Sequence, residues 1–276
     1  MNYTIQTLHL FPALDAKLVE LLQSLTPKEW NYPTLARQWT VKDIASHLLD
    51  GNIRMISIAR DGHMSKPSGP IASYQDLVQY LNQLNADWVN ATRRMSPAVL
   101  IELLRATGNE YYEQLKKLNP FEPALFSVAW AGQTESPNWF HIAREYTEKW
   151  HHQQQIRDAV NKPGIMSREF FYPLIDTFMQ ALPHTYRSVQ AEPATVVKVT
   201  VTTESGGEWF LERQTESWSL SKTQSKNIDA EVTLNPDTAW KLFTKGMGPA
   251  EAEQKLKFSG NLALGKPVLT MLSVMA

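Results

Sequence analysis

The segment that decides the fold reads HIAREYTEKWHHQQQI over residues 141–156. Within it, His141, Glu145, Glu148 and His152 are spaced four, three and four residues apart. Residues at this spacing share one face of an α-helix. A face made of histidine and glutamate, continued by Gln155, is not a hydrophobic seam. The pattern therefore predicts either a solvated helix face or a polar site that lines the inside of a helix bundle.

The chain before this stretch carries long segments of helical periodicity. Leucines recur every three or four residues over Pro12–Leu25, which predicts an amphipathic first helix. Thr40 is expected to cap a second helix, because Asp43 stands at the third helical position, close to a capping box. Further helices are expected over Ser73–Met95, over Pro97–Leu118 after the cap Ser96, and from Ser136 to about Val160. Four or five helices joined in part by the long loop 119–137 predict a four-helix bundle with a long crossover.

The character of the sequence changes near Asn161–Gly164. One more helix is expected over Arg168–Tyr186, with later helices from Asn235 and from Gly260 to the end. Short β-branched runs predict strands at Thr195–Thr203, Glu208–Glu212, Ser217–Ser221 and Ala230–Leu234, with a hairpin turn at Gly206-Gly207. Helices beside such a meander make a small α+β domain with an antiparallel sheet. The fold class is therefore a two-domain α+β protein, with domains over residues 1–163 and 164–276.

Composition narrows the classes of function. The 276 residues carry a net charge of −1 and no cysteine. A near-neutral chain gives no reason to expect a nucleic acid or an anionic membrane as partner. Without cysteine there is no disulfide, no thiolate metal ligand and no cysteine nucleophile. No targeting or membrane-spanning segment is recognised, so a cytoplasmic location is expected. The only partner expected is a small-molecule substrate. Nothing in the sequence indicates an oligomeric state.

A metal site is one interpretation of the polar face. Glu148 and His152 lie one helical turn apart, so both side chains can reach one divalent ion. A third ligand has to come from another helix, and His47 is the best candidate because it falls in the apolar register of the second helix. The alternatives are a surface Glu–His pair and a hydrogen-bonded core histidine. His151 points about 100° away from His152, and the two could exchange roles.

Two segments of the sequence resemble a known protein family. The segment Trp39–Gly51, read WTVKDIASHLLDG, resembles the second helix of the DinB-like family, and more specifically the N-terminal domain of mycothiol-dependent maleylpyruvate isomerases. The segment Glu148–Ile156 is similar to the last-helix motif of that family. The resemblance covers about residues 10–160 and implies that His47, Glu148 and His152 bind one divalent metal, zinc or nickel. The second half resembles, more weakly, the sterol-carrier-like domain that follows in the isomerase branch.

The resemblance also implies a chemistry. In this branch a low-molecular-weight thiol such as mycothiol, bacillithiol or glutathione docks on the metal as thiolate and adds to an electrophile. We therefore expect a thiol-dependent S-transferase or isomerase. From spacing alone, Glu145 lies one helical turn from Glu148 and is a candidate orienting group or base. A hydrolase that uses metal-bound water and a non-catalytic protein that binds an apolar ligand are the alternatives. Arg144 and Gln153 depart from the family pattern, and Arg213 is only a possible counterpart of its C-terminal catalytic arginine, so maleylpyruvate itself is not assigned as substrate.

Overall fold

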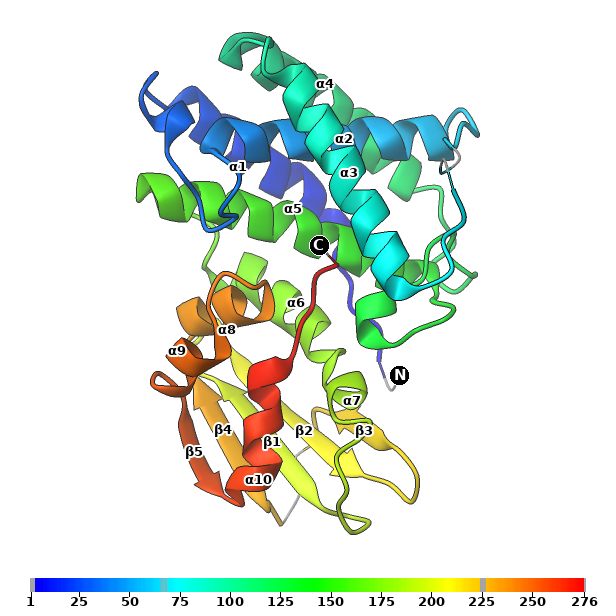
Figure 1. Cartoon of the computed structure of the whole chain (residues 1–276), viewed down its shortest axis with the longest axis vertical. Helices are drawn as coiled ribbons and strands as arrows, with labels where there is room; N and C mark the ends of the chain where they lie inside the picture. The colour runs from blue at the N-terminus through cyan, green and yellow to red at the C-terminus, as the bar shows by residue number, and fades with distance from the viewer. Residues whose placement is uncertain (1–2, 66, 68, 224–226, 276) are drawn as a thin grey trace. The chain divides into compact units, whose positions relative to one another are not determined.

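Two compact units make up the chain in this computed structural model, which describes residues 3–65, 67, 69–223 and 227–275. Of these residues, the helical unit contains those within 8–118, 148–165 and 275. The sheet unit contains those within 3–7, 119–147 and 166–274. Both units are visible in Figure 1. The border between the two units at residues 147 and 148 lies inside the helix over Asn138–Val160. The domain boundary expected between residues 163 and 164 stays a prediction.

Helices α1 to α4 and the second part of α5 form the helical unit. Their bounds are Phe11–Gln23 for α1, Val41–Ala59 for α2, Tyr74–Thr92 for α3, Pro97–Leu115 for α4 and Asn138–Val160 for α5. Helix α2 packs against both α3 and α4, and α1 packs against α4. The core between them is aliphatic, with Leu18, Leu22, Ile44, Leu48, Leu104 and Ile156 among its buried side chains. The expected helix bundle is confirmed.

Side-chain caps set where these helices begin. The Thr40 hydroxyl accepts from the Asp43 backbone amide, and the Asp43 carboxylate accepts from the Thr40 amide, so α2 opens on a complete capping box. Ser96 caps α4, and Pro97 follows it at the first helical position. Both caps agree with the sequence-based expectation. The cap on α2 matters most for the site, because it fixes the position of His47 within the second turn of that helix.

One buried cation ties three helices of this unit together. The Lys149 ammonium on α5 donates to both carboxylate oxygens of Asp15 on α1, at 2.9 and 3.1 Å, and to Asn52 Oδ1 on α2 at 2.9 Å. Its side chain is only 9% exposed and lies over the ring of Tyr111. Because a charge buried in this way needs its partners, the contact holds α5 in one rotation about its axis.

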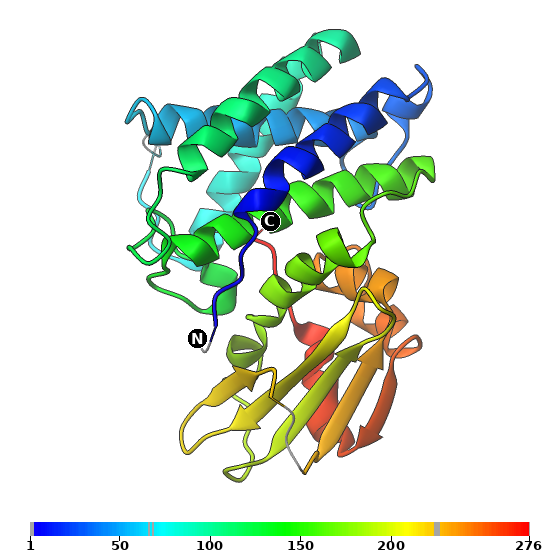
Figure 2. The same cartoon turned by 180° about the vertical axis from the view of Figure 1, so that it is seen from behind.

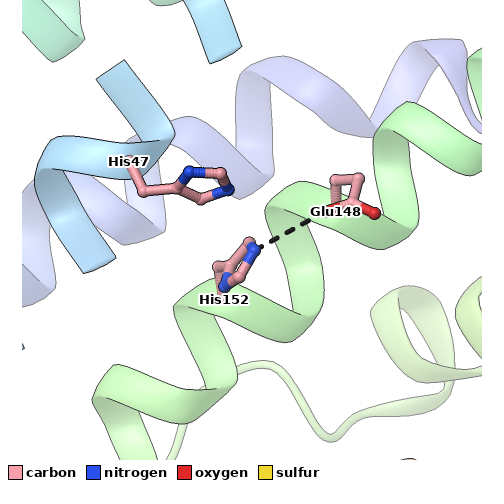
Figure 3. Close-up of side chains that lie close together, drawn as sticks. All are labelled: His47, Glu148 and His152. Atoms are coloured by element: carbon pink, nitrogen blue, oxygen red, sulfur yellow. Dashed lines mark ion pairs between the residues drawn. The ribbon is translucent and has the colours of Figure 1, made fainter. Parts of the chain in front are cut away.

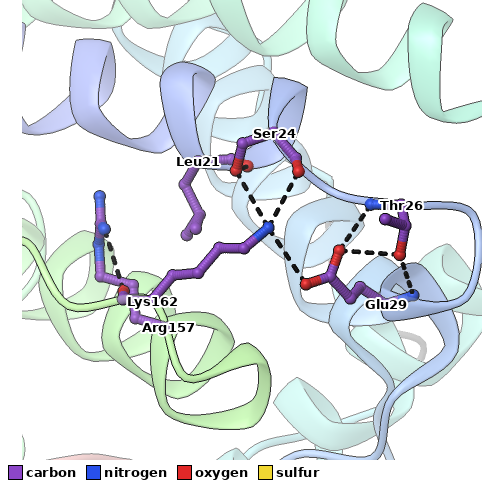
Figure 4. A network of polar contacts seen from close by, with 6 residues as sticks. All are labelled: Leu21, Ser24, Thr26, Glu29, Arg157 and Lys162. Carbon is purple, nitrogen blue, oxygen red and sulfur yellow. Dashed lines mark hydrogen bonds and ion pairs between the residues drawn. The ribbon is translucent and has the colours of Figure 1, made fainter.

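A second polar network holds the end of α5. The ammonium of Lys162 donates to the Ser24 carbonyl at 2.9 Å and pairs with Glu29 at 3.1 Å, as Figure 4 shows. Arg157 donates to the Lys162 carbonyl at 3.2 Å. Glu29 belongs to the short helix η2 (Glu29–Asn31) after α1. The end of α5 is thus fastened to the connection that follows α1.

The sheet unit is built on five strands in the order β3-β2-β1-β4-β5. Their bounds are Val196–Val201 for β1, Gly207–Arg213 for β2, Trp218–Ser221 for β3, Ala230–Leu234 for β4 and Lys257–Gly260 for β5. The fold class is confirmed, but the expectation of a purely antiparallel sheet is wrong in one pair. Strand β4 runs parallel to β1, with Val199 opposite Val232. Strand β3 lies at one edge of the sheet. The chain then crosses to the other side of β1, where β4 pairs with β1 in the same direction. No short-range sequence signal specifies this crossover.

The helices of the sheet unit are shorter than the sequence suggested. They are α6 (Arg168–Met179), α7 (Leu182–Thr185), α8 (Pro236–Phe243), α9 (Pro249–Glu253) and α10 (Leu262–Gly265), seen from behind in Figure 2. The single helix expected over Arg168–Tyr186 is broken at Gln180, and Pro183 stands in the first turn of the next helix. The helix expected from Gly260 onward also ends early, giving way to the 3-10 helix η4 (Lys266–Thr270). Proline lacks the backbone donor that a continuing helix needs.

The other two 3-10 helices are η1 (Leu8–Leu10), just before α1, and η3 (Ala129–Ala131), within the segment that leads to α5. Across the described residues, no helix combines the length and the hydrophobicity that crossing a bilayer requires.

Replacing Lys149 with alanine is expected to lower the free energy of unfolding by about 3–5 kcal/mol, because Asp15 would stay partly buried without its cation. Urea denaturation measures this change. Lys116→Ala is the matched control, since Lys116 pairs with the exposed Glu113 and should cost less than about 1 kcal/mol. Equal losses in the two variants would contradict the structural role assigned to Lys149.

Candidate metal centre

Three side chains from two helices of the helical unit converge. His47 comes from α2, and Glu148 and His152 come from successive turns of α5. One possible ligand atom from each residue lies within 4.8 Å of the other two. The carboxylate of Glu148 is 3.5 Å from His152 Nε2, and Figure 3 shows the three side chains pointing toward one another. The structure therefore brings together all three residues that the sequence predicted as ligands.

The orientation of His152 follows from its neighbour one turn later. Its Nδ1 lies 2.9 Å from Gln155 Oε1 within the buried face of α5. An amide oxygen only accepts hydrogen bonds, so Nδ1 carries the proton and donates it. Nε2 is then the nitrogen left for a metal ion, and it is the one that faces Glu148. A ring held through its far nitrogen is the arrangement that metal-binding histidines use.

His47 lies in an apolar and aromatic setting. Its ring centroid is 4.8 Å from that of Trp39 and 4.6 Å from that of His152, the second pair meeting edge-on. Burial lowers the pKa of His47 well below its ordinary value, and His152 acts in the same direction while Glu148 opposes it. His47 is therefore a neutral imidazole at pH 7, which is the form that binds metals. Within the described chain, its buried Nδ1 has no hydrogen-bond partner.

The donor set fits a divalent transition metal. Two neutral imidazoles and one carboxylate are ligands that suit zinc, nickel and similar ions. Three protein ligands also leave a coordination position for a small molecule, as in catalytic rather than structural sites. Among the described histidine, aspartate and glutamate residues, no second group of three comes together in this way.

The other histidines of the segment lie outside this group. The ring of His151 is 3.9 Å from that of His152, centroid to centroid, and His151 is buried. In the sheet unit, His141 Nδ1 lies 2.9 Å from an Arg144 nitrogen and 3.8 Å from Glu145, and Arg144 pairs with Glu145. Burial lowers the pKa of His141 to about 4. The role expected for Glu145 stays a prediction.

Two contacts of the centre were not assigned from the sequence. The tilted ring contact between Trp39 and His47 was missed, although Trp39 stands directly before the cap of α2. Gln155 was recognised only as a continuation of the polar face, and its hydrogen bond to His152 emerges from the structure. Spacing of three residues between His152 and Gln155 was the available signal for this contact.

Comparisons with known proteins show the family and the fold. The family model described as the mycothiol maleylpyruvate isomerase N-terminal domain matches residues 11–157. Two crystal structures of the mycothiol-dependent maleylpyruvate isomerase, one of them a histidine-to-alanine mutant, share the fold with TM-scores of 0.53 and 0.54. Their sequence identities are 12% and 11%, and each alignment covers 92% of both chains. No curated protein sequence gives a match.

The buried His141 is expected to make stability depend on pH. Its pKa is about 4 in the folded chain and about 6.5 when unfolded, so the unfolded chain takes up the proton first as pH falls. Its contribution to stability is complete above about pH 6.5 and falls by ~3 kcal/mol on the way to about pH 4. Urea denaturation across this range should therefore show a smaller loss in His141→Gln than in the unmodified chain.

The exposed His63 provides the control, since His63→Gln removes a histidine without removing a buried one. We expect its pH profile to match that of the unmodified chain. A profile for His141→Gln that is parallel to the profile of His63→Gln would show that burial of His141 is not linked to folding.

Proposed function

The chain belongs to the family of the mycothiol maleylpyruvate isomerase N-terminal domain, whose family model matches more than half of it, and on this premise we propose that it is a divalent-metal-dependent enzyme. The proposed reaction class is thiol-dependent S-transfer or isomerisation of a small electrophilic molecule. The metal ligands are His47, Glu148 and His152, and the metal is zinc or nickel.

The observation that carries the proposal is the convergence of these three side chains. Their possible ligand atoms lie within 4.8 Å of one another, although His47 is about a hundred residues away from the other two in the chain. The same three positions match the motifs through which the sequence resembles the family. A surface Glu–His pair would need neither the half-buried His47 from another helix nor the hydrogen bond from His152 to Gln155.

The chain's own residues set what this centre does. His152 presents a nitrogen whose ring is oriented by Gln155, and His47 presents a neutral imidazole beside the ring of Trp39. Glu148 adds the negative charge that favours a cation between the two rings. A divalent metal held by these three residues would act as a Lewis acid and lower the pKa of a bound thiol, so that the thiol would be a thiolate near neutral pH. Because the chain has no cysteine, the sulfur has to belong to a cosubstrate such as mycothiol, bacillithiol or glutathione.

We expect about one divalent metal ion per chain after gentle purification, measured by elemental analysis. His152→Ala should abolish binding, because two remaining ligands do not hold the ion. His151→Ala is the matched control, since it changes the adjacent buried histidine, and it should retain the metal. Full metal retention in His152→Ala would contradict the assigned ligand set, and loss confined to His151→Ala would transfer the role to His151.

Turnover by the metal-loaded protein is expected to require an added low-molecular-weight thiol. Electrophilic small molecules would be incubated with and without mycothiol, bacillithiol or glutathione, and the products followed by mass spectrometry. Conversion should be thiol-dependent and should disappear in Glu148→Gln, which removes the charged ligand. Conversion without thiol that is also lost in this variant would identify a hydrolase instead. Native mass spectrometry that shows an apolar ligand on a metal-free chain would contradict both.

A further inference from the structure

We propose that Arg54, held by Asp50, forms an anion subsite beside the candidate metal centre, and that it binds a carboxylate group of the small molecule that reaches the metal. The inference rests on the proposed function, because the metal centre would hold the other end of that molecule. It adds a recognition element for one chemical class, small thiols or substrates that carry a carboxylate.

The spacing along α2 places Arg54 on the same face as His47. His47, Gly51 and Arg54 are separated by four and three residues, which is one face of a helix. Seven residues span ~10 Å along the helix axis. Helical side chains lean toward the N-terminus of their helix, so the long side chain of Arg54 reaches back along this face toward His47.

The contact with Asp50 shows that Arg54 does lean this way. Arg54 Nε lies 3.0 Å from Asp50 Oδ2, four residues earlier on the same helix. The Asp50 side chain is only 8% exposed, and burial raises the pKa of its carboxyl. An ordinary solvated helix pair would keep its carboxylate in water. In this pair the carboxylate of Asp50 is buried, and the side chain of Arg54 is 39% exposed.

The Arg54 guanidinium has more hydrogen-bond donors than its ion pair with Asp50 uses. Neither Arg54 Nε nor Asp50 Oδ2 completes a hydrogen bond of good geometry within the described residues. The ion pair with Asp50 is also the one ionic contact of Arg54 in the part of the chain that the structure describes. A guanidinium has five donors in a planar fork that matches a carboxylate, so the outward nitrogens can bind one in bidentate fashion.

The position of Gly51, between the two residues on this face, has room for added atoms. A Cβ added at Gly51 would meet no atom within 4 Å, although Gly51 lies one turn after His47 and three residues before Arg54. A ligand that binds the metal with one end can therefore extend over Gly51 and place an anionic end on Arg54.

Cobalt-loaded protein tests the subsite. The visible bands of Co²⁺ report metal binding, and the thiolate-to-cobalt charge-transfer band reports thiol binding. The probes are mercaptopropionate and its neutral analogue mercaptopropanol. We expect the carboxylate probe to bind about tenfold more tightly, as one charge-assisted contact implies. Arg54→Gln should remove this preference, with Co²⁺ binding and mercaptopropanol affinity unchanged.

Two further variants separate the subsite from general effects. Arg60→Gln removes the same charge from the exposed end of α2, where Arg60 pairs with Asp61, and should leave the preference intact. Gly51→Leu fills the space over the helix and should weaken mercaptopropionate binding while Co²⁺ still binds. Equal affinity for the two probes in the unmodified protein, or a preference that survives Arg54→Gln, would overturn the proposal.

Failure of Co²⁺ or of both thiols to bind would count against the proposed function. The subsite is then tested by an experiment on the metal-free protein. In that experiment phenylglyoxal modifies arginines, and peptide mass spectrometry follows Arg54 and Arg60 separately. Propionate should slow modification of Arg54 but not of Arg60, and propanol should slow neither. Equal effects of propionate on the two arginines would overturn the subsite without reference to the metal.

Discussion

The buried ammonium of Lys149 is the contact on which the geometry of the centre depends. It binds Asp15 on α1 and Asn52 on α2, so α5 can face these helices in only one rotation. Successive residues of a helix point about 100° apart. Once Lys149 is turned toward Asp15, Glu148 and His152 are turned toward His47. Gly108 contributes to the same contact, because a Cβ there would come within 2.9 Å of the Asp15 carboxylate.

Burial gives the ligand set its chemical character. His47 is neutral because it is taken out of water beside another imidazole, and His152 presents one defined nitrogen because Gln155 occupies the other. Glu148 then provides the compensating charge. With nitrogen and oxygen as the sole donor types and no cysteine in the chain, sulfur chemistry can enter only through a molecule that binds there.

Much of this was accessible from spacing and local chemistry. The capping box at Thr40, the cap at Ser96 and the ligand pair four residues apart on α5 are short-range features, and each lies where it was predicted. The parallel pairing of β1 with β4 and the breaks near Gln180 and in the last segment were not predicted. Strand direction depends on long-range pairing, and helix breaks depend on how well packing offsets a proline.

The sequence by itself determined that Glu148 and His152 share a helix face, because that relation needs only the α-helical repeat, and that any metal here is held without thiolates. It nominated His47 through its register and through family resemblance. Only the tertiary structure decided that His47 meets the other two, because the crossing of α2 and α5 depends on packing and on the buried charge of Lys149. The helical repeat alone places Arg54 one turn after Asp50, but only the tertiary structure buried Asp50 and left room at Gly51, because both depend on what packs against α2.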